Sequence, residues 1–279
     1  MNACMVELRG EGALPLAAEA WGDPAQPPVL LSHGGGQTRH SWRDTARILA
    51  ARGWYVLNYD HRGHGDSAWS PDGDYSLALH AADQRAVARS FATPPVLVGA
   101  SLGGLSALLA QGEWDGPLYR AIVLVDITPR MNEAGAREIL DFMEGTARDG
   151  FASLDEAADV IARYTGRKKR MNAAGLEKNL RLGEDGKYRW HWDPSILSLR
   201  GDATGQADRL ENATRKIDLP MLLIRGRESN VVTEETARHF LQLRPDAAYV
   251  DVADARHMVV GDRNEIFTRA VIEFIDSLD

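Results

Sequence analysis

The chain has 279 residues, of which 44% are hydrophobic and 26% are charged, and its formal net charge at pH 7 is −8. This globular composition suits one large domain or a core with an insertion, and the negative charge argues against nucleic acid as a partner. No apolar run approaches the roughly 20 residues that span a membrane, so we expect no membrane contact.

The single cysteine, Cys4, excludes an internal disulfide and fits a reducing cytoplasm. The N-terminal segment lacks the basic and apolar regions of a signal peptide. We therefore expect a cytoplasmic protein, either a monomer or a homodimer, that acts on a small-molecule substrate. A local basic run at 167–170 is expected to be a solvated helix end or loop.

Short apolar segments alternate with amphipathic ones over most of the chain. The first two predicted strands, 5–8 and 16–21, form an antiparallel pair. The later predicted strands are 28–32, 54–59, 96–98, 121–125, 221–224 and 248–252. The predicted helices are 41–52, 76–91, 104–110, 233–243 and 264–278. This alternation indicates a mostly parallel, eight-stranded sheet with helices on both faces.

The alternation is interrupted between residues 129 and 213, where helical segments occur without a convincing buried strand. We predict an α/β core made of residues 1–128 and 214–279. Residues 129–213 are then an insertion after the sixth strand, a helical cap over one edge of the sheet. A cap in this place would shape the substrate pocket.

A nucleophile is predicted at Ser101. The sequence Gly99-Ala100-Ser101-Leu102-Gly103 matches Gly-x-Ser-x-Gly between a predicted strand and a predicted helix. A strand that turns sharply into a helix holds the central residue in a strained, exposed conformation, and the glycines avoid clashes across the turn. The helix N-terminus behind Ser101 favours developing negative charge.

The predicted base is His257. Serine needs a base to remove its proton, and that base is usually a histidine held by a carboxylate. His257 lies after the last predicted strand and just before the last predicted helix. We expect folding to bring this imidazole and the Ser101 hydroxyl together at one edge of the sheet.

Four motifs occur in the order typical of one family. They are His33–Gly36, Asp60–Ser67, Gly99–Gly103 and Arg256–Met258. With them the chain resembles a protein of the α/β-hydrolase fold over nearly its whole length. The first resembles the loop that supplies an oxyanion-hole amide, and the second resembles the family's Asp-x-Arg-Gly-x-Gly-x-Ser loop. The third resembles the nucleophile elbow, and the fourth precedes the C-terminal helix as the family's histidine does.

The resemblance implies an oxyanion hole made by the backbone N–H groups of Leu102 and Gly35. Such a donor lowers the barrier by about 3 kcal/mol in the best-studied case. The resemblance also implies that His33 braces its loop and that Arg62 and Asp66 lock theirs through ionic contacts.

The triad acid is the point where the sequence departs from the family's pattern. The family commonly has an aspartate in the loop after strand 221–224, where this chain has Ser229. Glu228 lies one residue earlier and has a longer side chain. Asp126 ends the apolar strand 121–125, where some family members carry their acid, and a carboxylate there is costly unless it is hydrogen-bonded. We favour Asp126, with Glu228 as the alternative.

Large apolar side chains in the cap and near the predicted catalytic residues are candidates for the substrate pocket. Phe142, Trp190 and Trp192 belong to the predicted cap, Trp42 follows the glycine loop and Met258 follows the predicted base. Such a lining favours a small to medium apolar acyl or ring substrate.

These features predict a serine hydrolase that cleaves a carboxylic ester, thioester or lactone of a small apolar substrate through an acyl-enzyme. The same triad could instead hydrolyse a carbon–carbon bond or make peracids without a cofactor. The fold could also serve as a non-catalytic small-molecule receptor. No metal or cofactor is implied, because the sequence contains no His-Glu-x-x-His, paired-cysteine or Gly-x-Gly-x-x-Gly pattern.

Overall fold

The structure is a computed structural model that describes residues 3–165, 176–199, 203–253, 255–257 and 264–278. Met258 and the basic run 167–170 lie outside these ranges. Within the described residues, no helix combines the length and the apolar character needed to cross a bilayer.

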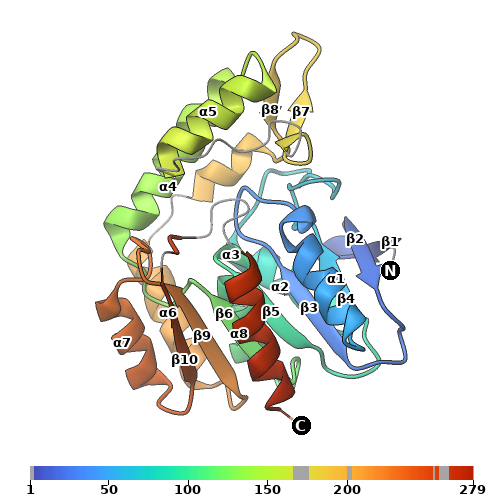
Figure 1. Cartoon of the computed structure of the whole chain (residues 1–279), viewed down its shortest axis with the longest axis vertical. Coiled ribbons are helices and arrows are strands. Elements are labelled where there is room, and N and C mark those ends of the chain that lie inside the picture. The colour runs from blue at the N-terminus through green and yellow to red at the C-terminus, as the bar shows by residue number, and fades with distance from the viewer. Residues whose placement is uncertain (1–2, 166–175, 200–202, 254, 258–263, 279) are drawn as a thin grey trace.

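The main sheet has eight strands, as predicted (Figure 1). They are β1 (Cys4–Arg9), β2 (Pro15–Trp21), β3 (Pro28–Ser32), β4 (Tyr55–Tyr59), β5 (Val96–Ala100), β6 (Ala121–Val125), β9 (Met221–Gly226) and β10 (Ala248–Val252). Their order across the sheet is β1-β2-β4-β3-β5-β6-β9-β10. The pairs β1–β2 and β2–β4 are antiparallel, and all other neighbours are parallel. The predicted antiparallel pair and the mostly parallel sheet are confirmed.

Helices cover both faces of this sheet (Figure 1). One face carries α1 (Arg43–Ala51) and α8 (Asn264–Asp276). The other carries α2 (Leu77–Ala88), α3 (Leu102–Gly112), α6 (Ala203–Arg215) and α7 (Glu234–Leu243). Because both faces are covered, β3, β5, β6 and β9 are buried along their full length, which explains their apolar sequences.

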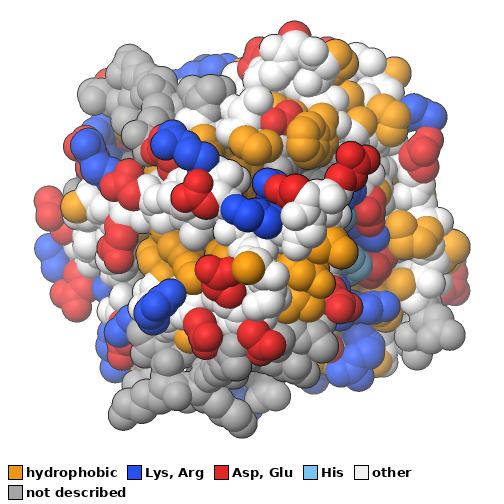
Figure 2. All heavy atoms as spheres, turned by 90° about the horizontal axis from the view of Figure 1, so that it is seen from above, with side chains coloured by type: hydrophobic (Ala, Val, Ile, Leu, Met, Phe, Trp, Pro, Cys, Tyr) orange, Lys and Arg blue, Asp and Glu red, His pale blue; other side chains and the backbone are white. Residues whose placement is uncertain are grey.

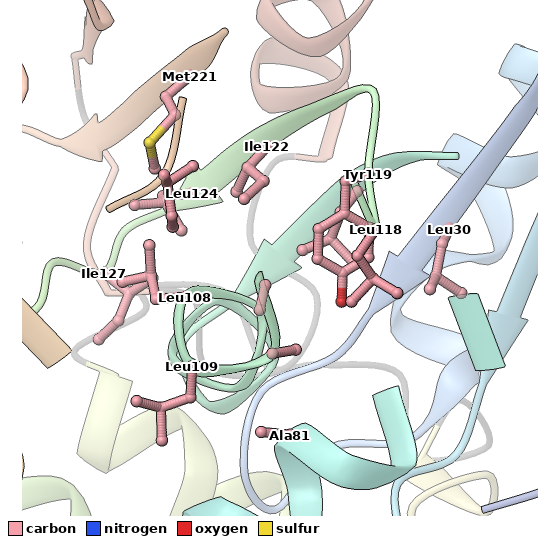
Figure 3. Packing of buried hydrophobic residues seen from close by; sticks show 14 of the residues in the cluster. Leu30, Ala81, Leu108, Leu109, Leu118, Tyr119, Ile122, Leu124, Ile127 and Met221 are labelled. Atoms are coloured by element: carbon pink, nitrogen blue, oxygen red, sulfur yellow. The ribbon is translucent and has the colours of Figure 1, made fainter. Parts of the chain in front are cut away.

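A hydrophobic cluster lies on each face of the sheet, and the larger one lies on the face that α3 covers. Figure 3 shows part of this cluster, in which Leu108 of α3 lies near Ile127 and Leu124, whereas Leu109 points to the side of α3 away from β6. All four side chains are completely buried. This packing fixes α3, and with it the turn that connects β5 to α3.

Most of the segment between β6 and α6 lies over the sheet at the top of Figure 1, and residues 133–165 and 176–199 of it are here called the cap. It contains α4 (Glu133–Asp149), α5 (Leu154–Thr165) and an antiparallel pair, β7 (Leu180–Leu182) and β8 (Tyr188–Trp190). No strand was predicted here. Because each of these strands has three residues, neither is long enough to produce an alternating pattern in the sequence.

Helix α6 crosses the boundary predicted at residue 213. Leu210 and Ala213 of α6 belong to the same buried cluster as Leu108 of α3. A Cβ on Gly112 would lie 2.3 Å from the Ala213 carbonyl oxygen, so the two helices are in close contact. By its packing, α6 therefore belongs with the core, which would resume earlier than residue 214. The division into core and cap otherwise stays a prediction.

The glycines on either side of Ser101 are expected to be indispensable for folding. A Cβ at Gly99 would lie 2.7 Å from the Gly103 carbonyl carbon, and one at Gly103 would lie 2.5 Å from the Ser32 carbonyl oxygen. Because these contacts are with backbone atoms, alanine at either position should lower the free energy of unfolding by more than about 3 kcal/mol. Urea denaturation followed by circular dichroism measures the loss.

The matched control is Gly145→Ala, inside α4, where a Cβ would meet nothing within 4 Å. That variant should be neutral or should stabilise the protein by up to about 1 kcal/mol, because alanine favours a helix interior over glycine. Similar losses of stability at positions 99 and 145 would contradict the tight packing of the turn.

Candidate active site

Ser101 lies at the sharp turn between β5 and α3, where it is the N-cap residue of the helix. Its φ of +45° and ψ of −114° are values that non-glycine residues rarely adopt. The close packing at Gly99 and Gly103 holds the turn in this strained form. The Ser101 side chain is half-buried and faces a cavity between the core and the cap.

Asp126 and His257 form a buried hydrogen bond although they are 131 residues apart in the chain. His257 Nδ1 lies 2.7 Å from Asp126 Oδ2, and both side chains are almost fully buried. Asp126 follows β6 with a φ of +49°, and its Oδ1 accepts a hydrogen bond from Gly226 N at 2.9 Å. A carboxylate at Nδ1 selects the tautomer in which Nε2 is free to accept a proton.

Ser229, at the position where the family commonly has its aspartate, is a second partner of the Asp126 carboxylate. Its Oγ donates to Asp126 Oδ2 at 2.7 Å and accepts from Val231 N and Val232 N at 3.2 and 3.1 Å. Because these N–H groups fill the acceptor positions of the hydroxyl, its single proton is left for the carboxylate. This contact was not predicted, since the two residues are 103 positions apart and no local pattern joins them.

Glu228, the alternative acid, lies outside this arrangement. Its carboxylate accepts a hydrogen bond from Arg256 Nε at 3.2 Å, and both side chains are half exposed. The carboxylate that contacts the His257 imidazole is that of Asp126.

Ser101 and His257 line the same cavity, which has a volume of about 220 Å³. Within the described residues no hydrogen bond joins their side chains, and such bonds often tighten only when substrate binds. The rest of the described lining is mostly apolar and contains no Lys, Arg, Asp or Glu. The core side contributes Leu102, Leu105 and Val231, and the cap side includes Ala136, Ile139, Leu140, Met143, Ile196 and Leu197.

Three of the predicted pocket residues, Phe142, Trp190 and Trp192, line this cavity. Phe142 stacks on Tyr164 with ring centroids 3.9 Å apart, and Trp190 meets Phe142 edge-on at 6.4 Å. Trp190 Nε1 donates to Thr146 Oγ1 at 2.8 Å, which satisfies the only polar atom of its side chain. The cap therefore presents a rigid aromatic wall to the cavity.

The prediction that Trp42 lines the pocket is wrong. Trp42 is 2% exposed and packs with Ala46 and Leu49 of α1 in the core on the α1 face of the sheet. Because it precedes these two residues by four and seven positions, it continues the apolar stripe of the helix, and that stripe faces the sheet. Met258, the other predicted pocket residue, lies outside the described residues.

The glycine loop after β3 offers one backbone N–H to the cavity. Gly34 N donates to Gln37 Oε1 at 3.1 Å, and Gly36 N donates to His64 Nε2 at 3.1 Å. No acceptor within the described residues takes the N–H of Gly35. Of these three amides, that of Gly35 is therefore available to a substrate oxygen.

This loop lies against the turn that carries Ser101. A Cβ on Gly34 would lie 3.3 Å from the Ser101 Cβ, and one on Gly35 would lie 4.0 Å from the Leu102 Cβ. Leu102 is the first residue of α3, so its N–H has no partner within the helix. The structure thus brings Gly35 and Leu102 together, and two N–H groups in such an arrangement can stabilise an oxyanion.

The face of the molecule seen from above in Figure 2, on the side of the cap, carries acidic and basic side chains interspersed with hydrophobic ones. Mixed signs produce no strong field that would steer a highly charged partner toward the site. In the part of the chain that the structure describes, no three His, Cys, Asp or Glu side chains are placed to hold a metal ion.

Four buried histidines, His33, His61, His64 and His80, cluster beneath the glycine loop, with neighbouring ring centroids 4.6 to 6.4 Å apart. Burial lowers the pKa of His33 to about 4 and, together with the nearby His33, that of His64 to about 3. Burial and the neighbouring imidazoles also hold the pKa values of His61 and His80 well below 6.5. All four rings are therefore neutral near pH 7.

We expect acid to destabilise the protein through this cluster. The unfolded chain binds protons on these histidines near pH 6.5, whereas the folded chain does not until the pH is much lower. Their contribution is therefore complete above pH 6.5 and falls as the pH drops toward 4, by about 1.4 kcal/mol per pH unit for each histidine. Urea unfolding at pH 7.5 and pH 5 tests this, and equal unfolding free energies would contradict it.

The comparison with protein families gives one match over most of the chain. The sequence model of the alpha/beta hydrolase family matches residues 29–270. This range contains the residues around Ser101, Asp126 and His257.

Two curated relatives are similar over nearly the whole chain. The esterase Rv0045c of Mycobacterium tuberculosis is 31% identical over 285 residues, which cover 99% of this chain and 90% of that protein. The 2-(acetamidomethylene)succinate hydrolase of Mesorhizobium japonicum is 30% identical over 256 residues, which cover 90% of this chain and 88% of its own.

Solved structures agree with this fold. The crystal structure of an E-2-(acetamidomethylene)succinate hydrolase has a TM-score of 0.82 at 25% identity and covers 99% of this chain and 100% of its own. A structure of the M. tuberculosis esterase has a TM-score of 0.77 at 25% identity and covers 99% of this chain and 92% of its own.

Proposed function

Because this chain belongs to the alpha/beta hydrolase family and is a hydrolase, we propose that it cleaves carboxylic esters, thioesters or lactones with a Ser101–His257–Asp126 triad. The observation that carries the proposal is that His257, which is held by a buried hydrogen bond to Asp126, lines the same apolar cavity as Ser101. Because this chain is a hydrolase related to an esterase, we do not propose the alternative function of a non-catalytic receptor.

In the proposed reaction, Ser101 attacks the carbonyl carbon while His257 Nε2 accepts the hydroxyl proton. The oxyanion accepts hydrogen bonds from Leu102 N–H and Gly35 N–H. His257 then protonates the leaving group, and an acyl group remains on Ser101. Water, activated by the same imidazole, releases the acid. Asp126 stabilises the imidazolium through the 2.7 Å contact at Nδ1.

The cavity favours a small, uncharged, apolar acyl group. Its volume of about 220 Å³ is below the range of drug-sized pockets, which begins at about 300 Å³. With no charged side chain in the described lining, a buried carboxylate would have no partner there. We therefore expect discrimination against dicarboxylates, such as the succinate derivative for which the M. japonicum relative is named.

A panel of p-nitrophenyl esters from acetate to palmitate, together with the half-ester of succinate, tests the proposal. We expect short and medium neutral acyl groups to be hydrolysed with the highest kcat/KM. A fluorophosphonate should label the peptide that contains Ser101, as read by mass spectrometry. Absence of both turnover and labelling would refute the proposal. Labelling with turnover of a vinylogous diketone but of no ester would favour the carbon–carbon hydrolase alternative.

A further inference from the structure

The two peptide groups on either side of Gly35 are each held by a buried histidine. Before Gly35, His33 Nδ1 lies 2.8 Å from the Gly34 carbonyl oxygen, and after it, Gly36 N donates to His64 Nε2 at 3.1 Å. In a trans peptide the C=O and the N–H point in opposite directions. Holding Gly34 O against His33 therefore turns the N–H of Gly35 to the opposite side, and the His64 contact fixes the next peptide plane.

The contacts of His64 define its protonation state. A ring nitrogen that accepts from an N–H carries no proton, so Nε2 is unprotonated. Nδ1 lies 3.0 Å from the Arg62 carbonyl oxygen, which can only accept, so Nδ1 carries the hydrogen. The ring is completely buried, which favours this neutral form. The other tautomer would set two N–H groups against each other at Gly36.

His64 is well placed to hold another residue, because its own loop is fixed at several points. Arg62 Nε and Nη2 donate to Asp83 of α2 at 2.6 and 2.7 Å, which is the ionic lock expected from the sequence. Gly65 N donates to the His191 carbonyl oxygen at 2.7 Å, which ties the loop to the cap. The His64 ring is thus carried by a segment anchored both to the core and to the cap.

The glycine loop needs such a support. Residues 34–36 have no side chains to pack, and Gly36 has a φ of +75°, so rotation of these peptides is restrained mainly by hydrogen bonds. An oxyanion donor stabilises the transition state only if it is already oriented when charge develops. Without the second contact the loop would be held on one side of Gly35 only, and a shift of the loop would displace the Gly35 N–H with it.

We propose that His64 is a positioning residue for the oxyanion hole, holding the Gly36 N–H through Nε2 so that the Gly35 N–H stays aimed at the reacting carbonyl. This inference rests on the proposed function. The buried His64 is not among the residues that line the cavity, and in this role it acts only through the backbone of the loop.

The first test uses the wild-type protein. Long-range 15N–1H NMR of the imidazoles at pH 7 should show His64 protonated at Nδ1 and unprotonated at Nε2. A hydrogen on Nε2 would overturn the proposal, because that nitrogen could then not accept from Gly36.

The second test compares two substitutions at His64 in ester hydrolysis. His64→Leu removes the acceptor and should lower kcat by about 10- to 100-fold with little change in KM, which is less than the loss of a complete oxyanion donor. His64→Gln brings an amide oxygen to about the same reach as Nε2 and should restore most of that loss. The control is His80→Leu, which removes a neighbouring buried ring that has no hydrogen-bond partner in the described structure. It should change kcat by less than about twofold, since it leaves the loop contacts in place.

A trifluoromethyl ketone with the preferred acyl group separates positioning from folding effects. It mimics the tetrahedral intermediate, so its affinity should fall with kcat/KM across the variants. Equal losses of kcat/KM in His64→Leu, His64→Gln and His80→Leu would overturn the proposal. A loss of kcat in His64→Leu with unchanged affinity for the inhibitor would also overturn it. If His64→Leu does not fold, His64→Asn replaces it, because that amide is too short to reach Gly36.

The outcomes also separate the two proposals. An active wild type whose activity is unaffected by His64→Leu would overturn the positioning role alone. A wild type that hydrolyses no ester would overturn the proposed function, and the positioning role with it.

Discussion

Ser101→Ala is expected to lower kcat/KM for p-nitrophenyl esters by about 10⁴- to 10⁶-fold, the range seen when the nucleophile of a serine triad is removed. The reason is that no acyl-enzyme can form without the hydroxyl, and only the oxyanion donors and substrate binding remain. The variant should fold normally, because alanine differs from serine by one half-buried oxygen. Steady-state kinetics and the melting temperature measure the two effects.

The matched control is Ser106→Ala in the same helix. Ser106 is buried, and its Oγ donates to the Leu102 carbonyl oxygen at 2.7 Å, away from the proposed reaction. Its loss should change stability by about 1 kcal/mol and activity by less than about twofold. If Ser101→Ala kept more than about 1% of wild-type activity, another nucleophile would have to be sought.

Asp126→Asn is expected to lower kcat by about 10³- to 10⁴-fold, as replacement of a triad aspartate does elsewhere. The carboxylate accepts hydrogen bonds from His257 Nδ1, Ser229 Oγ and Gly226 N, so it presents only acceptors to three donors. An asparagine amide turns one of these contacts into a clash between donors or forces the imidazole into the wrong tautomer. The variant should also lose about 1–3 kcal/mol of unfolding free energy.

Glu228→Gln is the natural control, because it makes the same chemical change on the alternative acid. Its carboxylate is half exposed and paired with Arg256, so activity should stay within about twofold of wild type. The comparison is decisive in either direction. A large loss in Glu228→Gln with an active Asp126→Asn would mean that the wrong carboxylate has been assigned.

The sheet and the nucleophile turn could be predicted because both depend on local chemistry. Buried strands such as 121–125 are continuous apolar runs, and their alternation with helices is visible in the sequence. At the turn, Gly99 is required by a backbone contact only four residues away, because a Cβ there would lie 2.7 Å from the Gly103 carbonyl carbon, whereas Gly103 is required by the distant Ser32 of the neighbouring strand. The role of Ser101 in catalysis stays a proposal, but its strained position was readable from the motif.

The placement of Trp42 could also have been predicted from local periodicity. It stands four and seven residues before Ala46 and Leu49, a spacing that is typical of the buried face of a helix. Its proximity in sequence to the glycine loop was a weaker guide than its helical phase, because side-chain direction follows the helix.

The arrangement around His257 was decided by the tertiary structure alone. Asp126 and Glu228 both follow strands that end at the same edge of the sheet, so the residue pattern favoured Asp126 but left Glu228 open. Sequence patterns report interactions between residues a few positions apart, set by the periods of helix and strand. The Asp126–His257 and Ser229–Asp126 contacts join residues 131 and 103 positions apart, and the Gly36–His64 contact joins residues 28 apart. Such pairs meet only when the packed sheet fixes the direction of each side chain.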